Sequence, residues 1–209
     1  MDAQRQIGRR RWITFAVVSL LALLLAHLFD GWAYRTLAVE DVYGDDLGRL
    51  FRVMGYLPTW LLASLALVLT DWPRRAFEGT RAALRRGGLL LAAVLASGIV
   101  GELLKLVFRR ERPRAHDGEY VFRAFTERPF HSGGLALPST HAVVAFGAAA
   151  MLSRLFPRAW FIWWGLAAGC AWTRVAAGAH FLSDVVLAGI VGWAVAEVIG
   201  RGWGGGGGG

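Results

Sequence analysis

Six apolar runs, separated by short charged segments, limit what this chain can fold into. An apolar helix of about 17–25 residues is long enough to cross a bilayer. A chain of 209 residues that is 56% hydrophobic is also too apolar for an ordinary soluble domain. We therefore predict an all-α polytopic membrane protein, a single domain of residues 1–203 with six transmembrane helices in one bundle. The runs are 12–29, 56–70, 88–108, 141–156, 159–173 and 182–199, of which the second and fifth are short for a span.

The two ends of the chain need separate interpretation. The first apolar run follows Arg9, Arg10 and Arg11, as the apolar part of a signal peptide would. Because further apolar runs follow and no clear small-x-small cleavage site is present, we interpret it as an uncleaved first span. The glycines at 204–209 form a low-complexity tail, disordered or of artificial origin, which we place outside the fold.

The formal charge of +8 comes almost wholly from arginine, and its distribution predicts an orientation. Nucleic-acid binding is one explanation for such a charge, but most of the arginines lie beside apolar runs. Loops rich in arginine favour the cytoplasm. If six spans alternate, the three arginine clusters share one side, and both termini are then cytoplasmic. The clusters lie at 5–11, 74–86 and 154–158.

The arginine-rich segment 109–137 falls on the opposite, outer side and breaks this pattern. Either a functional demand for cations or a miscounted span explains the exception. Before it, Leu47, Leu50, Phe51 and Met54 recur at helical spacing after a possible cap at Asp45 or Asp46. We expect an amphipathic helix there, on the outer membrane surface, acting as a connector or as a gate for substrate.

Lys105 is the only lysine of the chain and lies inside an apolar run. Arg112 follows it by seven residues, so a continuing helix would place both cations on one face before Pro113 stops it. Lysine offers a compact charge and arginine a planar fork for phosphate oxygens. A structural pair between Lys105 and Glu102, three residues apart, is the alternative.

The string Pro138-Ser139-Thr140-His141 precedes an apolar helix. Ser139 or Thr140 suits the N-cap position, and the free amides of a helix N-terminus favour an anion. His141 would then lie in the first turn, beside that anion. An ordinary capped helix start with an interfacial histidine is the alternative.

His180 and Asp184 lie four residues apart at the start of the last apolar run. On one helical face the carboxylate would reach the imidazole, fix its tautomer and leave the other ring nitrogen free to attack. Arg174 precedes them, separated by the small residues 175–179, which would let a phosphate approach the backbone. A His–Asp pair that only stabilises a helix end is the alternative. Three such strings at one membrane face make a purely structural role for all of them improbable.

These strings resemble the signature of the type 2 phosphatidic acid phosphatase superfamily, K-x6-RP, then PSGH, then SR-x5-H-x3-D. The match runs from Lys105 to Asp184, in order and with the family's spacing. Two positions depart from the signature: Thr140 stands where the family has glycine, and Thr173 where it has serine. Thr140 keeps its backbone amide, but its side chain is expected to narrow the pocket.

The resemblance implies a role for each matched residue. His180 would be the nucleophile that forms a phosphohistidine, Asp184 would orient it, and His141 would be the general acid and then the base for water. The phosphoryl oxygens would be held by Lys105, Arg112, Ser139, Thr140 and Arg174. No metal or other cofactor is implied, and the remaining histidines, His27, His116 and His131, are expected to be non-catalytic, although His131 could touch substrate.

The implied activity is hydrolysis of a phosphate or diphosphate monoester of a lipid, in a bacterial inner membrane with the site on the outer face. The substrate candidates are undecaprenyl diphosphate, phosphatidate, phosphatidylglycerol phosphate and lipid A, with a lean to the first. The expected partners are the lipid phosphate and the bilayer, with no nucleic acid. A lipid phosphotransferase and a non-enzymatic lipid-phosphate carrier are the alternatives. A carrier would need only the cations, and a soluble haloperoxidase, which shares the strings, would lack the apolar spans.

Overall fold

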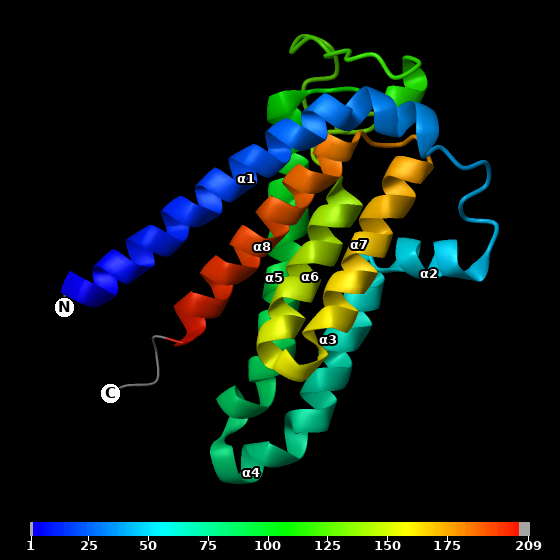
Figure 1. Cartoon of the computed structure of the whole chain (residues 1–209). Coiled ribbons are helices and arrows are strands. Elements are labelled where there is room, and N and C mark those ends of the chain that lie inside the picture. Colours follow the sequence, from blue (N-terminus) through cyan, green and yellow to red (C-terminus); the bar gives the residue numbers. More distant parts are fainter. Residues whose placement is uncertain (1, 205–209) are drawn as a thin grey trace.

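The computed structural model describes residues 2–204, and its regular structure is helical (Figure 1). Within that range the only β pairing is two isolated bridges in the segment between α5 and α6, so the predicted all-α class is confirmed. Gly204 ends the last helix, and the rest of the predicted glycine tail lies outside the described residues. The α-helices are α1 (Asp2–Thr36), α2 (Asp46–Val53), α3 (Leu57–Asp71), α4 (Arg75–Glu78), α5 (Thr80–Phe108), α6 (Thr140–Leu155), α7 (Trp160–Ala176) and α8 (Leu182–Gly204).

Each predicted apolar run lies almost wholly in one of the six longer helices, but six membrane crossings are not confirmed. Three helical stretches are long and apolar enough to cross a bilayer: Trp12–Thr36, Thr80–Phe108 and Leu182–Gly202. A fourth crossing exists if Asp46–Val53 and Leu57–Glu78, which meet at 69°, count as one broken span. The other helices are short: α3, α6 and α7 have 15, 16 and 17 residues, at or below the lower end of the range of about 17–25 residues.

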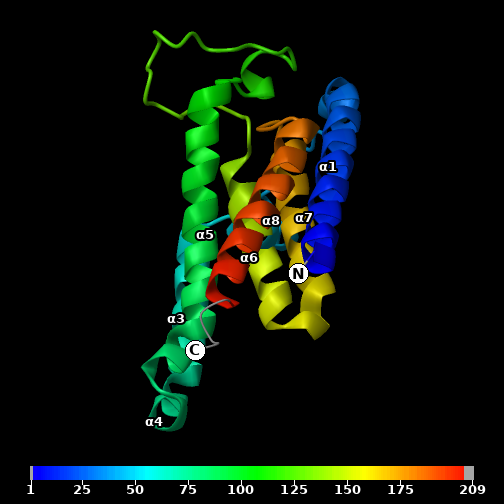
Figure 2. The ribbon, with the colours of Figure 1, turned by 90° about the vertical axis from the view of Figure 1, so that its left-hand side faces the viewer.

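Helix α6 lies at the centre of the bundle, packed against α5, α7 and α8 (Figures 1 and 2). Apolar side chains of α5 and α6, including Leu90, Val94, Val144 and Met151, form the main buried cluster. Glycine allows a close crossing between α6 and α8. A Cβ on Gly192 would lie 2.6 Å from the carbonyl oxygen of Val143 and 2.7 Å from the amide nitrogen of Gly147.

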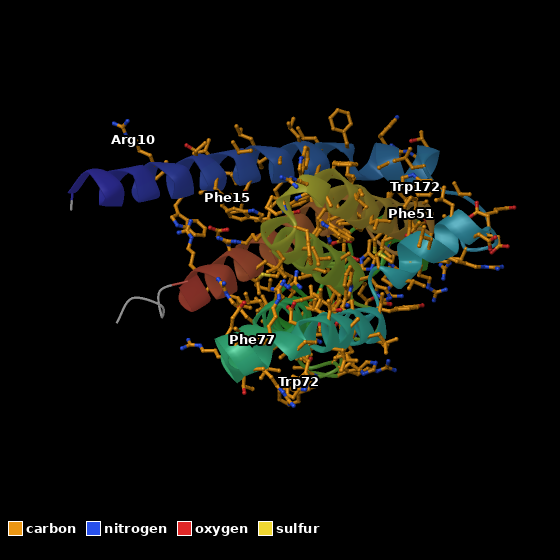
Figure 3. The ribbon with its side chains drawn as sticks, turned by 90° about the horizontal axis from the view of Figure 1, so that it is seen from below. Arg10, Phe15, Phe51, Trp72, Phe77 and Trp172 are labelled. Atoms are coloured by element: carbon orange, nitrogen blue, oxygen red, sulfur yellow. The ribbon has the colours of Figure 1, made fainter. Side chains whose placement is uncertain are left out.

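The outside of the bundle is covered by large apolar side chains (Figure 3). Leu28 of α1, Leu62 of α3 and Val107 of α5 are each more than 60% exposed. Exposed apolar surface on this scale is typical of a protein whose solvent is lipid. Helix α1 contributes little to the core and buries one narrow face, formed by Ala26, Asp30 and Ala33.

The predicted amphipathic helix is present as α2. Its N-cap is Asp45, whose Oδ1 accepts a hydrogen bond of 2.6 Å from the amide of Gly48. Phe51 packs on α7 at Gly169, where an added Cβ would lie 2.4 Å from the ring. Leu47 and Leu50 remain exposed, and the placement of α2 on the membrane surface stays a prediction.

The segment between α5 and α6 covers one end of the bundle (Figures 1 and 2). Buried Arg109 organises it: with φ 55° it ends α5, and its guanidinium donates to four backbone carbonyls of the segment. The chain therefore turns back over the helix ends instead of leaving the bundle. The accepting residues are Arg123, Ala124, Glu127 and Pro129.

Replacing Gly192 by alanine should destabilise the protein, because backbone atoms of α6 block the new methyl group and overpacking of this kind costs about 1–3 kcal/mol. The matched control is Gly165→Ala in α7, where a Cβ meets nothing within 4 Å. There, loss of glycine flexibility should stabilise the helix slightly. Thermal unfolding in detergent would compare the two, and equal unfolding temperatures would show that the α6–α8 crossing is looser than described.

Candidate active site

The three signature strings meet under the segment that covers the bundle. A cavity of about 730 Å³ is lined by five of the eight predicted site residues. Of the other three, Asp184 is four residues beyond His180 with its carboxylate 3.6 Å from that ring, Ser139 precedes Thr140, and Arg174 lies in the last turn of α7. The five lining residues are Lys105, Arg112, Thr140, His141 and His180.

Lys105 and Arg112 are brought to the cavity by a different backbone path from the one that the sequence predicted. Helix α5 ends at Phe108, so Lys105 and Arg112 do not share a helical face. The left-handed turn at Arg109 sends the chain back, and Arg112, with φ −71° and ψ 137°, enters the cavity from an extended segment. The predicted convergence is correct, but the predicted continuous helix is wrong because the helix stops four residues early.

His180 is buried, and its ring is held by two oxygen atoms. Its Nδ1 lies 2.9 Å from the carbonyl oxygen of Ala136 and 3.6 Å from Oδ2 of Asp184. His180 precedes α8, so a turn and not a helical face brings it to Asp184. Both oxygen atoms favour a proton on Nδ1, which leaves Nε2 unprotonated and free to attack.

Burial lowers the pKa of His180 to about 4, although Asp184 opposes the shift. The positive charges of Arg174 and Lys105 lower the pKa further. The imidazole is therefore neutral at pH 7, as a nucleophile requires.

His141 lies in the first turn of α6, where Tyr56 packs edge-on against its ring with the centroids 5.3 Å apart. The junction between α2 and α3 presses on the same residue, since a Cβ on Gly55 would lie 2.6 Å from that of His141. The position of this histidine is thus set by chain segments far from it in sequence.

Buried polar atoms without a partner mark an anion site. Ser139 is the N-cap residue of α6, as predicted, but its hydroxyl does not cap the helix and makes no hydrogen bond. The Nε atoms of Arg112 and Arg174 are also buried and unpartnered. Such atoms are uncommon and need an explanation. These three are among nine such atoms in the described residues. All three belong to the predicted phosphate-binding set, and phosphate oxygens would satisfy them.

The three cations of the site, Lys105, Arg112 and Arg174, make few hydrogen bonds within the protein. Lys105 Nζ lies 3.2 Å from Oε1 of Glu102, so the alternative structural pair does form, although Lys105 still lines the cavity. Arg174 donates from Nη1 to the hydroxyl of Tyr43, at 2.7 Å. Burial and the nearby charge of Arg174 lower the pKa of Arg112.

At both positions that depart from the signature, the threonine hydroxyl makes a hydrogen bond to a nearby residue. The hydroxyl of Thr140 donates to Glu102 Oε1 at 2.5 Å, which draws this side chain toward α5. The hydroxyl of Thr173 donates to the carbonyl of Cys170 within α7. Glu102 therefore joins Thr140 to Lys105, an arrangement that a glycine at 140 would not allow.

One side of the cavity is apolar. Below the cations it runs along α5 from Lys105 to Val94, about 16 Å at the rise of an α-helix. The polar groups thus lie at one end of a cavity whose other end faces the apolar part of the bundle. The apolar wall comprises Leu57, Val94, Leu95, Ile99, Leu103 and Val144.

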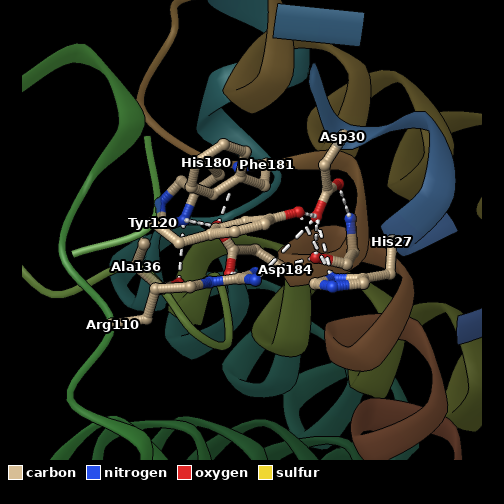
Figure 4. Close-up of polar contacts among 9 residues, drawn as sticks. His27, Asp30, Arg110, Tyr120, Ala136, His180, Phe181 and Asp184 are labelled. Atoms are coloured by element: carbon tan, nitrogen blue, oxygen red, sulfur yellow. Dashed lines mark hydrogen bonds and ion pairs between the residues drawn. The ribbon is translucent and has the colours of Figure 1, made fainter. Parts of the chain in front are cut away.

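Sequence reasoning missed the residues behind His180. Arg110 donates to Asp184 and to Ser183, and Asp30 of α1 accepts from Ser183 and Tyr120 (Figure 4). An available signal was Asp30 itself, because an acidic residue inside an apolar run usually has a partner or a function. Arg110 lies among the six unspecified residues of the first string.

The histidines that we predicted to be non-catalytic, His27, His116 and His131, do not line the cavity. His116 pairs with Glu111 in the covering segment, with 2.5 Å between Nε2 and Oε2. In the part of the chain that the structure describes, no group of three or more His, Cys, Asp and Glu residues could hold a metal ion.

Comparison with known proteins agrees with the site. The lipid A 1-phosphatase of Rhizobium etli is 35% identical over 195 residues, covering 84% of this chain and 78% of the relative. The lipid A 4′-phosphatase of Porphyromonas gingivalis is 23% identical over 152 residues, covering 72% and 63%. Both are bacterial, and with the apolar helices they support a bacterial membrane protein.

The fold has a solved counterpart. The crystal structure of the transmembrane PAP2 type phosphatidylglycerolphosphate phosphatase from Bacillus subtilis matches with a TM-score of 0.64. The alignment covers 92% of this chain and 94% of that one, at 16% identity, and so shows the fold alone. Residues 86–202, more than half of the chain and including all three strings, match the family model of the PAP2 superfamily. The chain therefore belongs to the PAP2 superfamily, and the relatives named above are lipid phosphatases.

Proposed function

We propose that this protein hydrolyses a phosphate or diphosphate monoester of a membrane lipid through a phosphohistidine on His180. One observation carries the proposal: a single cavity holds two histidines and two cations at one end and an apolar wall at the other. The polar end suits a phosphoryl group and the apolar side suits a lipid chain. A water-soluble phosphate ester would make no use of that wall.

In the first step Nε2 of His180 attacks phosphorus, and the bond from phosphorus to the ester oxygen breaks. His141, which lines the same cavity, donates a proton to the departing oxygen. In the second step His141 takes a proton from water, which attacks the phosphohistidine, so that inorganic phosphate leaves and His180 is restored.

The phosphoryl oxygens would be held by Lys105, Arg112, Arg174, the hydroxyl of Ser139 and the amide of Thr140. Hydrogen bonds to charged groups contribute about 1.5–3 kcal/mol each. They accelerate the reaction where they strengthen as charge develops in the transition state. The unpartnered Nε atoms and hydroxyl described above are the donors available for this purpose.

The relatives make lipid A the first substrate to test, and undecaprenyl diphosphate, phosphatidate and phosphatidylglycerol phosphate follow. We place the site on the outer face of a bacterial inner membrane. In α1 and α8 the ends near the site are Thr36 and Leu182, so the other ends of these two helices, Asp2 and Gly204, lie toward the opposite end of the bundle (Figure 1). The arginine clusters favour the cytoplasm for that end.

The decisive experiment is a phosphate-release panel with these four lipids in detergent, run beside His180→Ala. The variant should lose at least about 1,000-fold in rate, because the proposed phosphohistidine cannot form without this imidazole. Size-exclusion chromatography would confirm that it still folds. Substantial phosphate release by folded His180→Ala would refute the nucleophile, and transfer of phosphate to a second lipid on thin-layer plates would replace hydrolase by phosphotransferase.

The pH dependence should reflect the neutral His180. Because the pKa of this imidazole is about 4, protonation of the nucleophile should reduce kcat/KM only below about pH 5. Initial rates in a constant-ionic-strength buffer series would test this. An acid limb near the ordinary histidine value of about 6.5 would mean that water reaches the ring more freely than the geometry allows.

Activity should persist in excess chelator, because the cations that neutralise the phosphoryl charge are side chains. The assay is phosphate release after dialysis against EDTA, with and without added Mg²⁺. Loss of turnover that a divalent ion restores would contradict the proposed chemistry.

A further inference from the structure

A buried network of charges joins α1 to the carboxylate behind His180. Asp30 is completely buried, although α1 is otherwise largely exposed. Its Oδ1 accepts from the amide of Ser183 at 2.7 Å, and its Oδ2 accepts from the hydroxyls of Tyr120, at 2.9 Å, and of Ser183. Burying a carboxylate on an apolar helix is costly unless it is paired, so this contact calls for an explanation.

Arg110 lies between Asp30 and Asp184 (Figure 4). Its Nη2 donates to Oδ1 of Asp184 and, at 2.8 Å, to the hydroxyl of Ser183. Its Nη1 is 3.8 Å from Oδ2 of Asp30. The guanidinium also makes cation–π contacts with the rings of Tyr120 and Phe181, with its central carbon 5.3 and 4.9 Å from their centroids, and these contacts help to hold it in place.

The second carboxylate oxygen of Asp184 lies close to His180. This oxygen, Oδ2, accepts from the amide of Phe181 at 2.7 Å and lies 3.6 Å from Nδ1 of His180. All four oxygen atoms of the two carboxylates therefore have hydrogen-bond donors. Two carboxylates share one arginine, so the group carries a formal charge of −1 next to His180.

We propose that Asp30 and Arg110 are positioning residues, which hold the Asp184 carboxylate at His180 and set the negative charge that this imidazole experiences. The inference rests on the proposed function, in which His180 forms a phosphohistidine. During attack the imidazole gains positive charge, and a fixed carboxylate on its Nδ1 side stabilises it without rearranging. Asp30 keeps Arg110 from neutralising Asp184 completely, and Arg110 keeps Asp184 from turning away.

The two residues should shift the acid limb of the pH profile in opposite directions. Asp30→Asn removes a negative charge, and Arg110 then neutralises Asp184 more completely. His180 should therefore become protonated at a lower pH. Arg110→Gln removes a positive charge and releases Asp184, so His180 protonates at higher pH. The other charged or titratable groups that act on His180 stay unchanged in both variants: Lys105 of α5, His141 of α6 and Arg174 of α7.

The test compares kcat, KM and the acid limb of kcat/KM in both variants on the best lipid of the panel. For Asp30→Asn we expect kcat to fall by about 10- to 100-fold, with KM within about threefold, as for a small misplacement of a catalytic group. The acid limb should move by about half a unit or more, downward for Asp30→Asn and upward for Arg110→Gln.

Asp71→Asn is the matched control. Asp71 is also a buried carboxylate held by an arginine, here Arg86, but it ends α3 at the other end of the bundle. Loss of this charge should lower the unfolding temperature and leave kcat and the acid limb as in the wild type. It separates a general effect of breaking a buried ion pair from an effect on His180.

If Asp30→Asn cannot be purified in folded form, Tyr120→Phe gives the same test from the more exposed side of the network. Loss of its hydrogen bond to Asp30 should lower kcat at least about threefold with KM unchanged.

Each outcome has one interpretation. If the wild type releases phosphate from none of the lipids, the proposed function fails. If the wild type is active, any one of three results overturns the positioning role. The first is that Asp30→Asn has the same kcat and acid limb as Asp71→Asn. The second is that the acid limbs of Asp30→Asn and Arg110→Gln move in the same direction, and the third is that Tyr120→Phe leaves kcat unchanged.

Discussion

The concentration of buried positive charge at one end of an apolar bundle dominates this structure. Lys105 and Arg174 are buried and Arg112 is partly buried, with Glu102 as the carboxylate that pairs with Lys105. Like charges in a poorly solvated site repel, and each loses hydration. A bound anion such as a phosphoryl dianion would relieve the repulsion and replace the lost hydration, so the proposed substrate would be stabilised by the same charges that otherwise repel one another.

The helical packing brings these groups together. Glycine contacts let α6 approach α8 closely, and α5 packs along the other side of α6. The N-terminus of α6, the turn before α8 and the end of α5 then meet at one place. The covering segment, held down by Arg109, returns Arg112 and the carbonyl of Ala136 to the same point. Apolar packing therefore determines where the polar groups of the site lie.

Helix α1 shows how a membrane protein uses a single polar contact. Its outer surface is apolar and exposed, and its buried face is narrow. In lipid, apolar surface gives helices little reason to choose one neighbour over another. The buried pairing of Asp30 with Ser183, Tyr120 and Arg110 supplies that specificity, and it also connects the first helix to the region of His180.

The sequence by itself determined the helical segments and the chemical residues of the site, because apolar runs and motif spacing are local properties of the chain. It did not determine the number of crossings, since three of the helices are near the length limit. It misplaced the end of α5, because the left-handed turn at Arg109 depends on carbonyls that reach it from the covering segment. Only the tertiary structure decided that Ala136 holds His180 and that Asp30 reaches Ser183 across 153 residues. No periodic pattern records such contacts, because they depend on how distant segments pack.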